Sequence, residues 1–227
     1  MCQTIVILLL LALVALVAYV AYASATISSG FFVKATCRLG SPSSLLLTFD
    51  DGPDPRYTPA LLDLLARLNV RAVFFVIGQK AQAHPELIRR MVAEGHLVGN
   101  HTFVHNPFYA FRSARSIARE LRATDDVLRS LGVEPKLFRP PLGITNRAIA
   151  KAAALMNYRT VGWSIRSFDT RRSDTPERIL KRVESRISGG DIVLLHDRMP
   201  DVCRLVGQIV IFARERHGIE RFDHRSL

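Results

Sequence analysis

The chain has 227 residues, enough for one domain with a substantial core beside a short terminal segment. Lys and Arg outnumber Asp and Glu by 31 to 20, and the resulting net charge of +11 favours anionic partners such as acidic lipid headgroups or cell-wall polymers. No nucleic-acid-binding motif accompanies this charge, so we expect no nucleic-acid partner. The three cysteines include no C-x-x-C pair, which argues against a disulfide framework and against a cysteine-based metal or redox site.

The first predicted element is an apolar span. No charged side chain precedes Lys34, and residues 5–23 are almost purely apolar, about the length that crosses the hydrocarbon core of a bilayer. We therefore predict a transmembrane anchor over residues 1–25. Ala23-Ser24-Ala25 would also suit signal-peptide cleavage, but no Lys or Arg precedes the apolar run, which favours an uncleaved anchor.

Beyond the span, short apolar strands alternate with helices. Residues 26–43 are expected to form a linker and residues 44–227 a single domain. Prolines at the first turn support several helix starts. The pattern predicts strands at 45–49, 72–77, 97–100, 137–139, 159–162 and 192–195, and helices at 59–68, 85–94, 113–131, 145–156, 176–187 and 202–216. This βα alternation predicts an α/β fold with parallel strands and helices outside.

Two motifs supply carboxylates and imidazoles in a pattern typical of a metal site. The segment TFDDGP carries Asp50 and Asp51, and HTFVH carries His101 and His105. Imidazole nitrogen and carboxylate oxygen are preferred zinc ligands, and catalytic sites use three such ligands with one open position. On a helical turn, residues four apart project from one face. One aspartate would complete the ligand set and the other would accept a proton from the attacking water.

Three further motifs agree with a hydrolase. In RPPLG, the two prolines after Arg139 lack backbone donors, so Leu142 offers the first free N–H, which could face a developing oxyanion. The segment WSIRSFDT follows, with Asp169 near its end. DIVLLHD then ends an apolar strand with His196, a suitable acid for a leaving amine. Every motif falls at the carboxyl end of a predicted strand, where α/β barrels place their sites.

In this order and spacing, the five motifs resemble the polysaccharide deacetylase family (carbohydrate esterase family 4, the NodB-homology domain), and the resemblance covers residues 44–222. It implies that the domain is a distorted, incomplete (β/α) barrel. The predicted N-terminal transmembrane helix would precede this barrel in the chain. The implied reaction removes an N-acetyl group from an amino sugar of a peptidoglycan- or chitin-like glycan and releases acetate. The implied cofactor is one divalent metal ion, zinc, with cobalt or nickel as alternatives.

The resemblance also implies a role for each matching residue. Asp50 matches the general base, and the metal triad is matched by Asp51, His101 and His105. Arg139 matches the arginine that orients the base.

On the acid side, His196 matches the general acid and Asp169 the aspartate that tunes it. Leu142 matches the residue whose amide serves the oxyanion hole, and Leu195 matches a residue lining the acetyl pocket. Leu142 replaces a tyrosine common in the family, and Thr170 stands where many members have a tryptophan. Both departures concern the substrate cleft rather than the metal.

Several alternatives stay open. The same chemistry could act on an O-acetyl ester, or deformylate or deacetylate a lipid-linked amino sugar. A different class is a catalytically silent, membrane-tethered glycan-binding module, although every catalytic position holds a competent residue. The resemblance favours a domain outside the cytoplasm, in the cell envelope, whereas Lys34 and Arg38 after the span favour a cytoplasmic flank.

Overall fold

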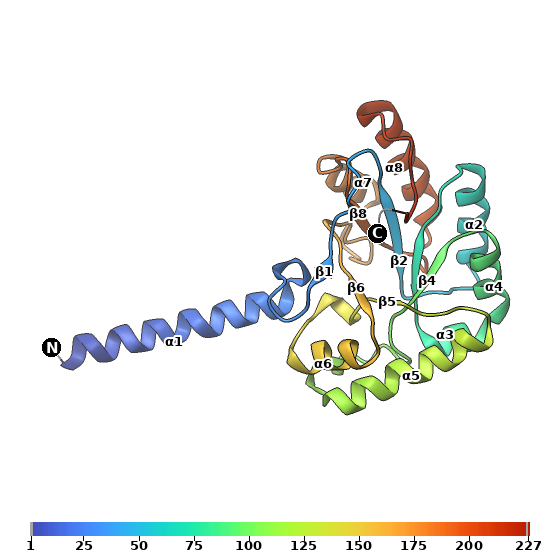
Figure 1. Cartoon of the computed structure of the whole chain (residues 1–227). Helices are drawn as coiled ribbons and strands as arrows, with labels where there is room; N and C mark the ends of the chain where they lie inside the picture. Colours follow the sequence, from blue (N-terminus) through green and yellow to red (C-terminus); the bar gives the residue numbers. More distant parts are fainter. Residues whose placement is uncertain (1, 226) are drawn as a thin grey trace.

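A long N-terminal helix extends away from the rest of the molecule (Figure 1). The computed structural model describes residues 2–225 and 227. The helix α1 (Cys2–Ala25) is long and apolar enough to cross a membrane, a property that membrane anchors share with signal sequences. Large apolar side chains along it, such as Leu9 and Val14, are two-thirds exposed. Burying such a surface in a bilayer would remove it from water.

The domain is built on a curled, fully parallel sheet. Over the described residues the sheet has eight strands in the order β1-β6-β5-β4-β3-β2-β8-β7. The strand bounds are β1 Ala35–Thr36, β2 Leu46–Asp50, β3 Val73–Val76, β4 Leu97–Asn100, β5 Leu137–Phe138, β6 Arg159–Val161, β7 Ile165–Arg166 and β8 Ile192–His196. β1 and β7 form the two edges. This confirms the predicted α/β class and its incomplete barrel.

Helices cover the outside of the sheet (Figure 1). Their bounds are α2 Thr58–Arg67, α3 Gly78–Ala83, α4 Pro85–Ala93, α5 Ala114–Ser130, α6 Arg147–Leu155, α7 Pro176–Glu184 and α8 Val202–His217, with 3₁₀ turns η1 Ile27–Ser29, η2 Tyr109–Phe111 and η3 Pro141–Gly143. Prolines in the first turn of α2, α4 and α7 mark three starts as predicted. The core lies between sheet and helices and includes the stacked rings of Phe49 and Phe74.

The segment 26–43, expected to be a linker, takes part in the fold instead. β1 extends the sheet beside β6, with Ala35 opposite Thr160. Ile27 is buried and lies against Gly162, where an added Cβ would contact its side chain. A two-residue strand has too little periodicity to be recognised in the sequence. For the same reason β7 was not predicted.

The end of α1 is bonded to the domain. The Ser24 hydroxyl donates to the Thr145 carbonyl (2.7 Å), and the Thr145 N–H donates to the Ser24 carbonyl (2.9 Å). Ala23 is completely buried. The last turn of α1 therefore packs against the loop between β5 and α6, which also carries the RPPLG motif.

Parallel pairing brings the functional motifs to one edge of the sheet. β2 ends at Asp50, β4 at Asn100 and β8 at His196, and Asp50 lies opposite His196 in the register of β2 and β8. Because parallel strands end on the same side, residues about 50 and 150 positions apart in the chain become neighbours.

Candidate active site

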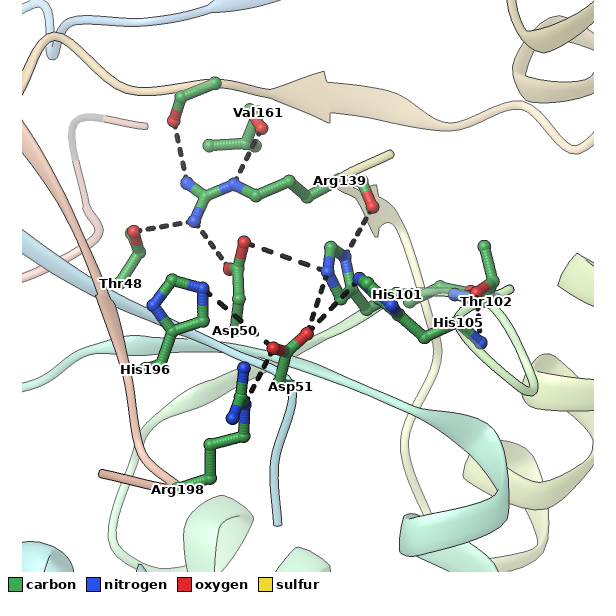
Figure 2. Close-up of polar contacts among 12 residues, drawn as sticks. Thr48, Asp50, Asp51, His101, Thr102, His105, Arg139, Val161, His196 and Arg198 are labelled. Atoms are coloured by element: carbon green, nitrogen blue, oxygen red, sulfur yellow. Dashed lines mark hydrogen bonds and ion pairs between the residues drawn. The ribbon is translucent and has the colours of Figure 1, made fainter. Parts of the chain in front are cut away.

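The two adjacent aspartates point to different partners because the strand ends between them. Asp50 closes β2 in extended conformation, and Asp51 follows with φ 71°. This left-handed conformation is uncommon for a residue with a Cβ. It separates the carboxylates: one Asp50 oxygen accepts a bond from Arg139 (2.7 Å), while Asp51 faces the two histidines (Figure 2).

Asp51, His101 and His105, predicted from the sequence as metal ligands, lie together in a cluster that could hold a metal ion. Asp51 Oδ1 lies 3.5 Å from His101 Nε2 and 3.3 Å from His105 Nε2, and the three candidate ligand atoms lie within 4.8 Å of one another. Ligands about 2.1 Å from a tetrahedral zinc ion are separated by about 3.4 Å. Asp51 Oδ1 is buried and has no hydrogen-bond partner among the described residues. An unpaired carboxylate oxygen at this spacing fits a divalent cation.

The histidine pair lies on a loop and not on a helical turn, so that part of the sequence interpretation was wrong. Thr102 (φ 69°) and His105 (φ 49°) adopt left-handed backbone conformations, which are incompatible with a helix. The Asn100 side chain accepts a bond from the Thr102 N–H (2.8 Å), and the Thr102 hydroxyl accepts one from the His105 N–H (3.2 Å). These bonds bring His105 back beside His101.

The hydrogen bonds of His101 determine which nitrogen is free. Its Nδ1 lies 2.7 Å from the Arg139 carbonyl oxygen, which can only accept, so Nδ1 carries the proton. Nε2, facing Asp51, then has its lone pair available for a cation. Such a bond fixes both the tautomer and the orientation of a metal-ligating histidine.

The electrostatics keep the cluster ready to bind a cation. Burial by itself would raise the pKa of Asp51, but the close approach of His101 and of the other nearby imidazoles holds that pKa well below its usual range. Burial, followed by the charge of His101, lowers the pKa of His105. An ionised carboxylate and a neutral imidazole are the forms that bind metal.

Arg139 is a completely buried cation that holds Asp50 in place. Its guanidinium donates to Asp50 Oδ1 (2.7 Å) and to the Thr48 hydroxyl (2.8 Å). It also donates to the carbonyls of Val161 (3.0 Å) and Gly162 (2.7 Å), so β2 and β6 are bridged by one side chain (Figure 2). The predicted role of Arg139 in orienting Asp50 agrees with these contacts.

His196 and Asp169 form a second hydrogen-bonded pair at the site. His196 Nδ1 lies 2.8 Å from Asp169 Oδ1, and the other Asp169 oxygen accepts the His196 N–H (2.8 Å). The Ser167 hydroxyl donates to the same carboxylate (2.9 Å). Burial lowers the pKa of His196, but the bond to Asp169 and its charge outweigh burial and raise that pKa above its ordinary value. The predicted contact between the two is present.

These residues surround a small cavity of about 120 Å³. It is lined by Asp50, Asp51, His101, His105, Leu142, Gly143, Trp163, Arg166, Thr170, Leu194, His196 and Arg198. A larger surface hollow, about 630 Å³, lies near Arg71 and Phe222, on the side where β2 and β3 begin. That hollow holds no metal-binding cluster among the described residues, so the chemistry assigns the function to the smaller cavity.

Leu142 lies at the cavity with half of its surface exposed and with φ 59°. The following amides, of Gly143 and Ile144, donate to the carbonyls of Pro140 and Pro141. Leu142 therefore contributes to the wall of the cavity, and the use of its amide in an oxyanion hole stays a prediction.

The structure differs from the sequence interpretation at Leu195. This side chain is completely buried in the core beneath the helices, whereas Leu194 lines the cavity. Side chains alternate along a strand, so the residue sharing the face of His196 is two positions before it. Counting back in steps of two would have identified Leu194.

Two arginines at the cavity were not singled out in the sequence. Arg198 Nε donates to Asp51 Oδ2 (2.9 Å), and Arg166 lies at the end of β7. Neither belongs to a recognisable spacing pattern. Asp197, beside His196, is completely buried and accepts a bond from the Thr58 hydroxyl (2.6 Å). Burial raises the pKa of Asp197 to about 7.

Comparison with known proteins agrees with this site. The polysaccharide deacetylase family model matches residues 39–161. A peptidoglycan-N-acetylglucosamine deacetylase of Bacillus cereus is 42% identical over 67% of this chain and 72% of its own length. A chitooligosaccharide deacetylase of Sinorhizobium fredii is 39% identical over 71% of this chain and 74% of its own.

A solved structure gives the same result. A family 4 carbohydrate esterase from Streptomyces lividans, in complex with acetate, has a TM-score of 0.72 and 28% identity, covering 82% of this chain and 92% of its own. The family model spans more than half of the chain, and the relatives are well above 30% identical. The chain is therefore an enzyme of the polysaccharide deacetylase family.

Proposed function

We propose that this protein is a metal-dependent deacetylase that hydrolyses the N-acetyl group of an amino-sugar residue in a glycan and releases acetate. The observation that carries the proposal is one cavity that combines a three-residue metal cluster, a carboxylate outside that cluster (Asp50) and an aspartate-bound imidazole (His196). The names of the relatives support N-acetylglucosamine units as substrate.

The residues divide the reaction between a base and an acid. Asp50, held by Arg139, accepts the proton of the attacking water. The Leu142 amide donates to the oxygen that gains negative charge. His196, kept protonated by Asp169, delivers a proton to the departing nitrogen. Asp51, His101 and His105 would hold a divalent ion, which would supply Lewis-acid polarisation of the carbonyl and a lowered pKa for the attacking water.

We propose that α1 stays attached and anchors the domain in the cell envelope. The hydrogen bonds between Ser24 and Thr145 and the burial of Ala23 support this, because cleavage after Ala25 would remove residues that are packed in the domain. The family relationship supports a catalytic domain on the exported side, where N-acetylated glycans are found, and the net charge of +11 suits anionic lipids or polymers there.

The first test removes and restores the metal. The full chain in detergent, stripped with a chelator and resupplied with zinc, cobalt or nickel, is expected to regain acetate release from N-acetylglucosamine oligomers, with peptidoglycan as a parallel substrate. Restored acetate release supports the proposal. Tight metal binding without acetate from either substrate would contradict it, and formate release from a formylated amino sugar would redirect it.

The second test separates the two aspartates. Asp50→Asn is expected to lower kcat by about 100- to 10,000-fold, since a general base is lost, while the bound metal stays near one equivalent. Asp51→Asn is the matched comparison and is expected to lose metal. Metal analysis beside kinetics measures both. Loss of metal from Asp50→Asn would mean that Asp50 is a ligand.

The third test uses pH. The acid form of His196 is required, so kcat/KM falls as pH rises through its pKa, which Asp169 raises. Asp169→Asn removes that stabilisation and is expected to move the basic limb of the pH profile to lower pH. Asp63→Asn, which loses an ion pair with Arg90 between α2 and α4, is the control. An unmoved basic limb would contradict the pairing.

The fourth test concerns α1. Intact-mass analysis of protein purified from membranes is expected to show residues 1–25 still present, with the protein resisting extraction by alkaline carbonate. A soluble form beginning at Thr26 would overturn the proposal of a retained anchor. A second variant, Ser24→Ala with Thr145→Val, removes the side-chain bonds between the helix and the loop. It is expected to lower thermal stability without releasing the protein from the membrane.

A further inference from the structure

Two guanidinium groups line the cavity without belonging to the catalytic set described above. Arg166, at the end of β7, and Arg198, in the loop between β8 and α8, both contribute to its wall. Arg198 lies beside Asp51 in Figure 2. The reaction proposed above assigns neither of them a task, and hydrolysis of an uncharged acetamido sugar needs no additional cation.

Arg166 is a half-buried cation with no acidic partner. Its guanidinium carbon lies 5.5 Å from the ring centroid of Trp163 and 4.9 Å from that of Phe168. Over residues 2–225 and 227, no carboxylate lies within ion-pair distance of it. Burial, and then the charge of Arg171, lower its pKa. Aromatic faces position a guanidinium and stabilise it only partly.

Arg198 is placed to hold Asp51 and still present a charge. Its Nε donates to Asp51 Oδ2, which leaves Oδ1 facing the histidines. Among the described residues its two terminal nitrogens have no acceptor, and its side chain is 40% exposed. A planar guanidinium with two free N–H groups matches the geometry of a phosphate or a carboxylate.

The balance of charges around the cavity, with a divalent ion bound, also favours an anionic group on the substrate. At and beside the cavity, the carboxylates of Asp50, Asp51 and Asp169 are matched in number by the guanidiniums of Arg139, Arg166 and Arg198, and the proposed reaction keeps His196 protonated as well. A divalent ion in the cluster therefore adds positive charge that no protein group in this set compensates. A neutral sugar brings nothing to offset it, whereas an anionic substituent does.

We propose that Arg166, together with Arg198, forms a subsite for an anionic substituent of the substrate sugar, a phosphate or a carboxylate carried alongside the acylamino group. The inference rests on the proposed function for the acylamino part and adds the class of sugar. It distinguishes a glycosyl phosphate or a carboxylate-bearing amino sugar from an uncharged chitin-like oligomer. Arg166 is a specificity-determining residue in this scheme.

Binding measurements test the subsite independently of turnover. The full-length Asp50→Asn variant, loaded with zinc in detergent, is titrated by calorimetry with N-acetylglucosamine, N-acetylglucosamine 1-phosphate and N-acetylmuramic acid. We expect at least one anionic sugar to bind about 10- to 100-fold more tightly than the neutral sugar, the range of one or two charge-assisted hydrogen bonds. Preference for the phosphate identifies a glycosyl phosphate, and preference for the muramic acid a carboxylate.

Variants locate the effect. Arg166→Gln in the same background is expected to remove the preference and leave binding of N-acetylglucosamine within about threefold, while Arg166→Lys keeps part of it. Arg115→Gln, on the exposed face of α5, removes the same charge away from the cavity and is expected to change nothing. Equal affinity for all three sugars overturns the proposal. So does a preference that survives Arg166→Gln, since Arg166 would then not determine the specificity for the anion.

Acetate release separates this inference from the proposed function. If the otherwise wild-type enzyme releases acetate equally from neutral and anionic sugars and shows no binding preference, the subsite is refuted and the deacetylase function stands. If anionic sugars bind preferentially through Arg166 and no sugar yields acetate, the subsite stands and the deacetylase proposal fails.

Discussion

The buried ion pair of Arg139 and Asp50 is the interaction on which the rest of the site depends. A fully buried guanidinium is tolerable only when its charge is paired and its donors are satisfied, and here a carboxylate, a hydroxyl and two carbonyls do so. Removing one partner of such a pair typically costs about 3–5 kcal/mol. The backbone carbonyl of Arg139 also accepts a hydrogen bond from the Nδ1–H of His101. One residue therefore positions Asp50 and fixes the tautomer of His101.

The site also stores backbone strain that hydrogen bonds hold in place. Left-handed non-glycine residues cost of order 1–3 kcal/mol each and persist where the surroundings determine them. A β-branched residue such as Thr102 is especially unfavourable there, and the Asn100 side chain compensates by accepting its N–H. Asn100 is itself fixed from behind by donating to the Leu121 carbonyl and to Asp125. Around the cavity, positive φ angles occur at Asp51, Thr102, His105, Leu142 and Phe168.

The sequence predicted the class of fold and the residues that meet at the strand ends, because both depend on residue type and strand order. It did not predict contacts that depend on the conformation of loops. Parallel strands bring Asp50, Asp51 and His196 together whatever the loops do, and the class of fold followed from the βα alternation. The spacing of His101 and His105 suggested a helical turn. A loop with left-handed residues brings side chains of the same spacing together, and the sequence pattern does not reveal its φ angles. The choice of Leu195 over Leu194 ignored strand alternation, information that was present in the sequence. Arg198 reaches Asp51 only through tertiary structure.

The contact between α1 and the β5–α6 loop links the anchor to the chemistry. Thr145, bonded to Ser24, is three residues after Leu142, so the last turn of the helix is bonded to the same short loop that lines the cavity. With α1 in a bilayer, this short connection would hold the cavity close to the headgroup region rather than at the end of a flexible tether. A substrate approaching along a membrane surface would meet the arginines and the metal cluster together.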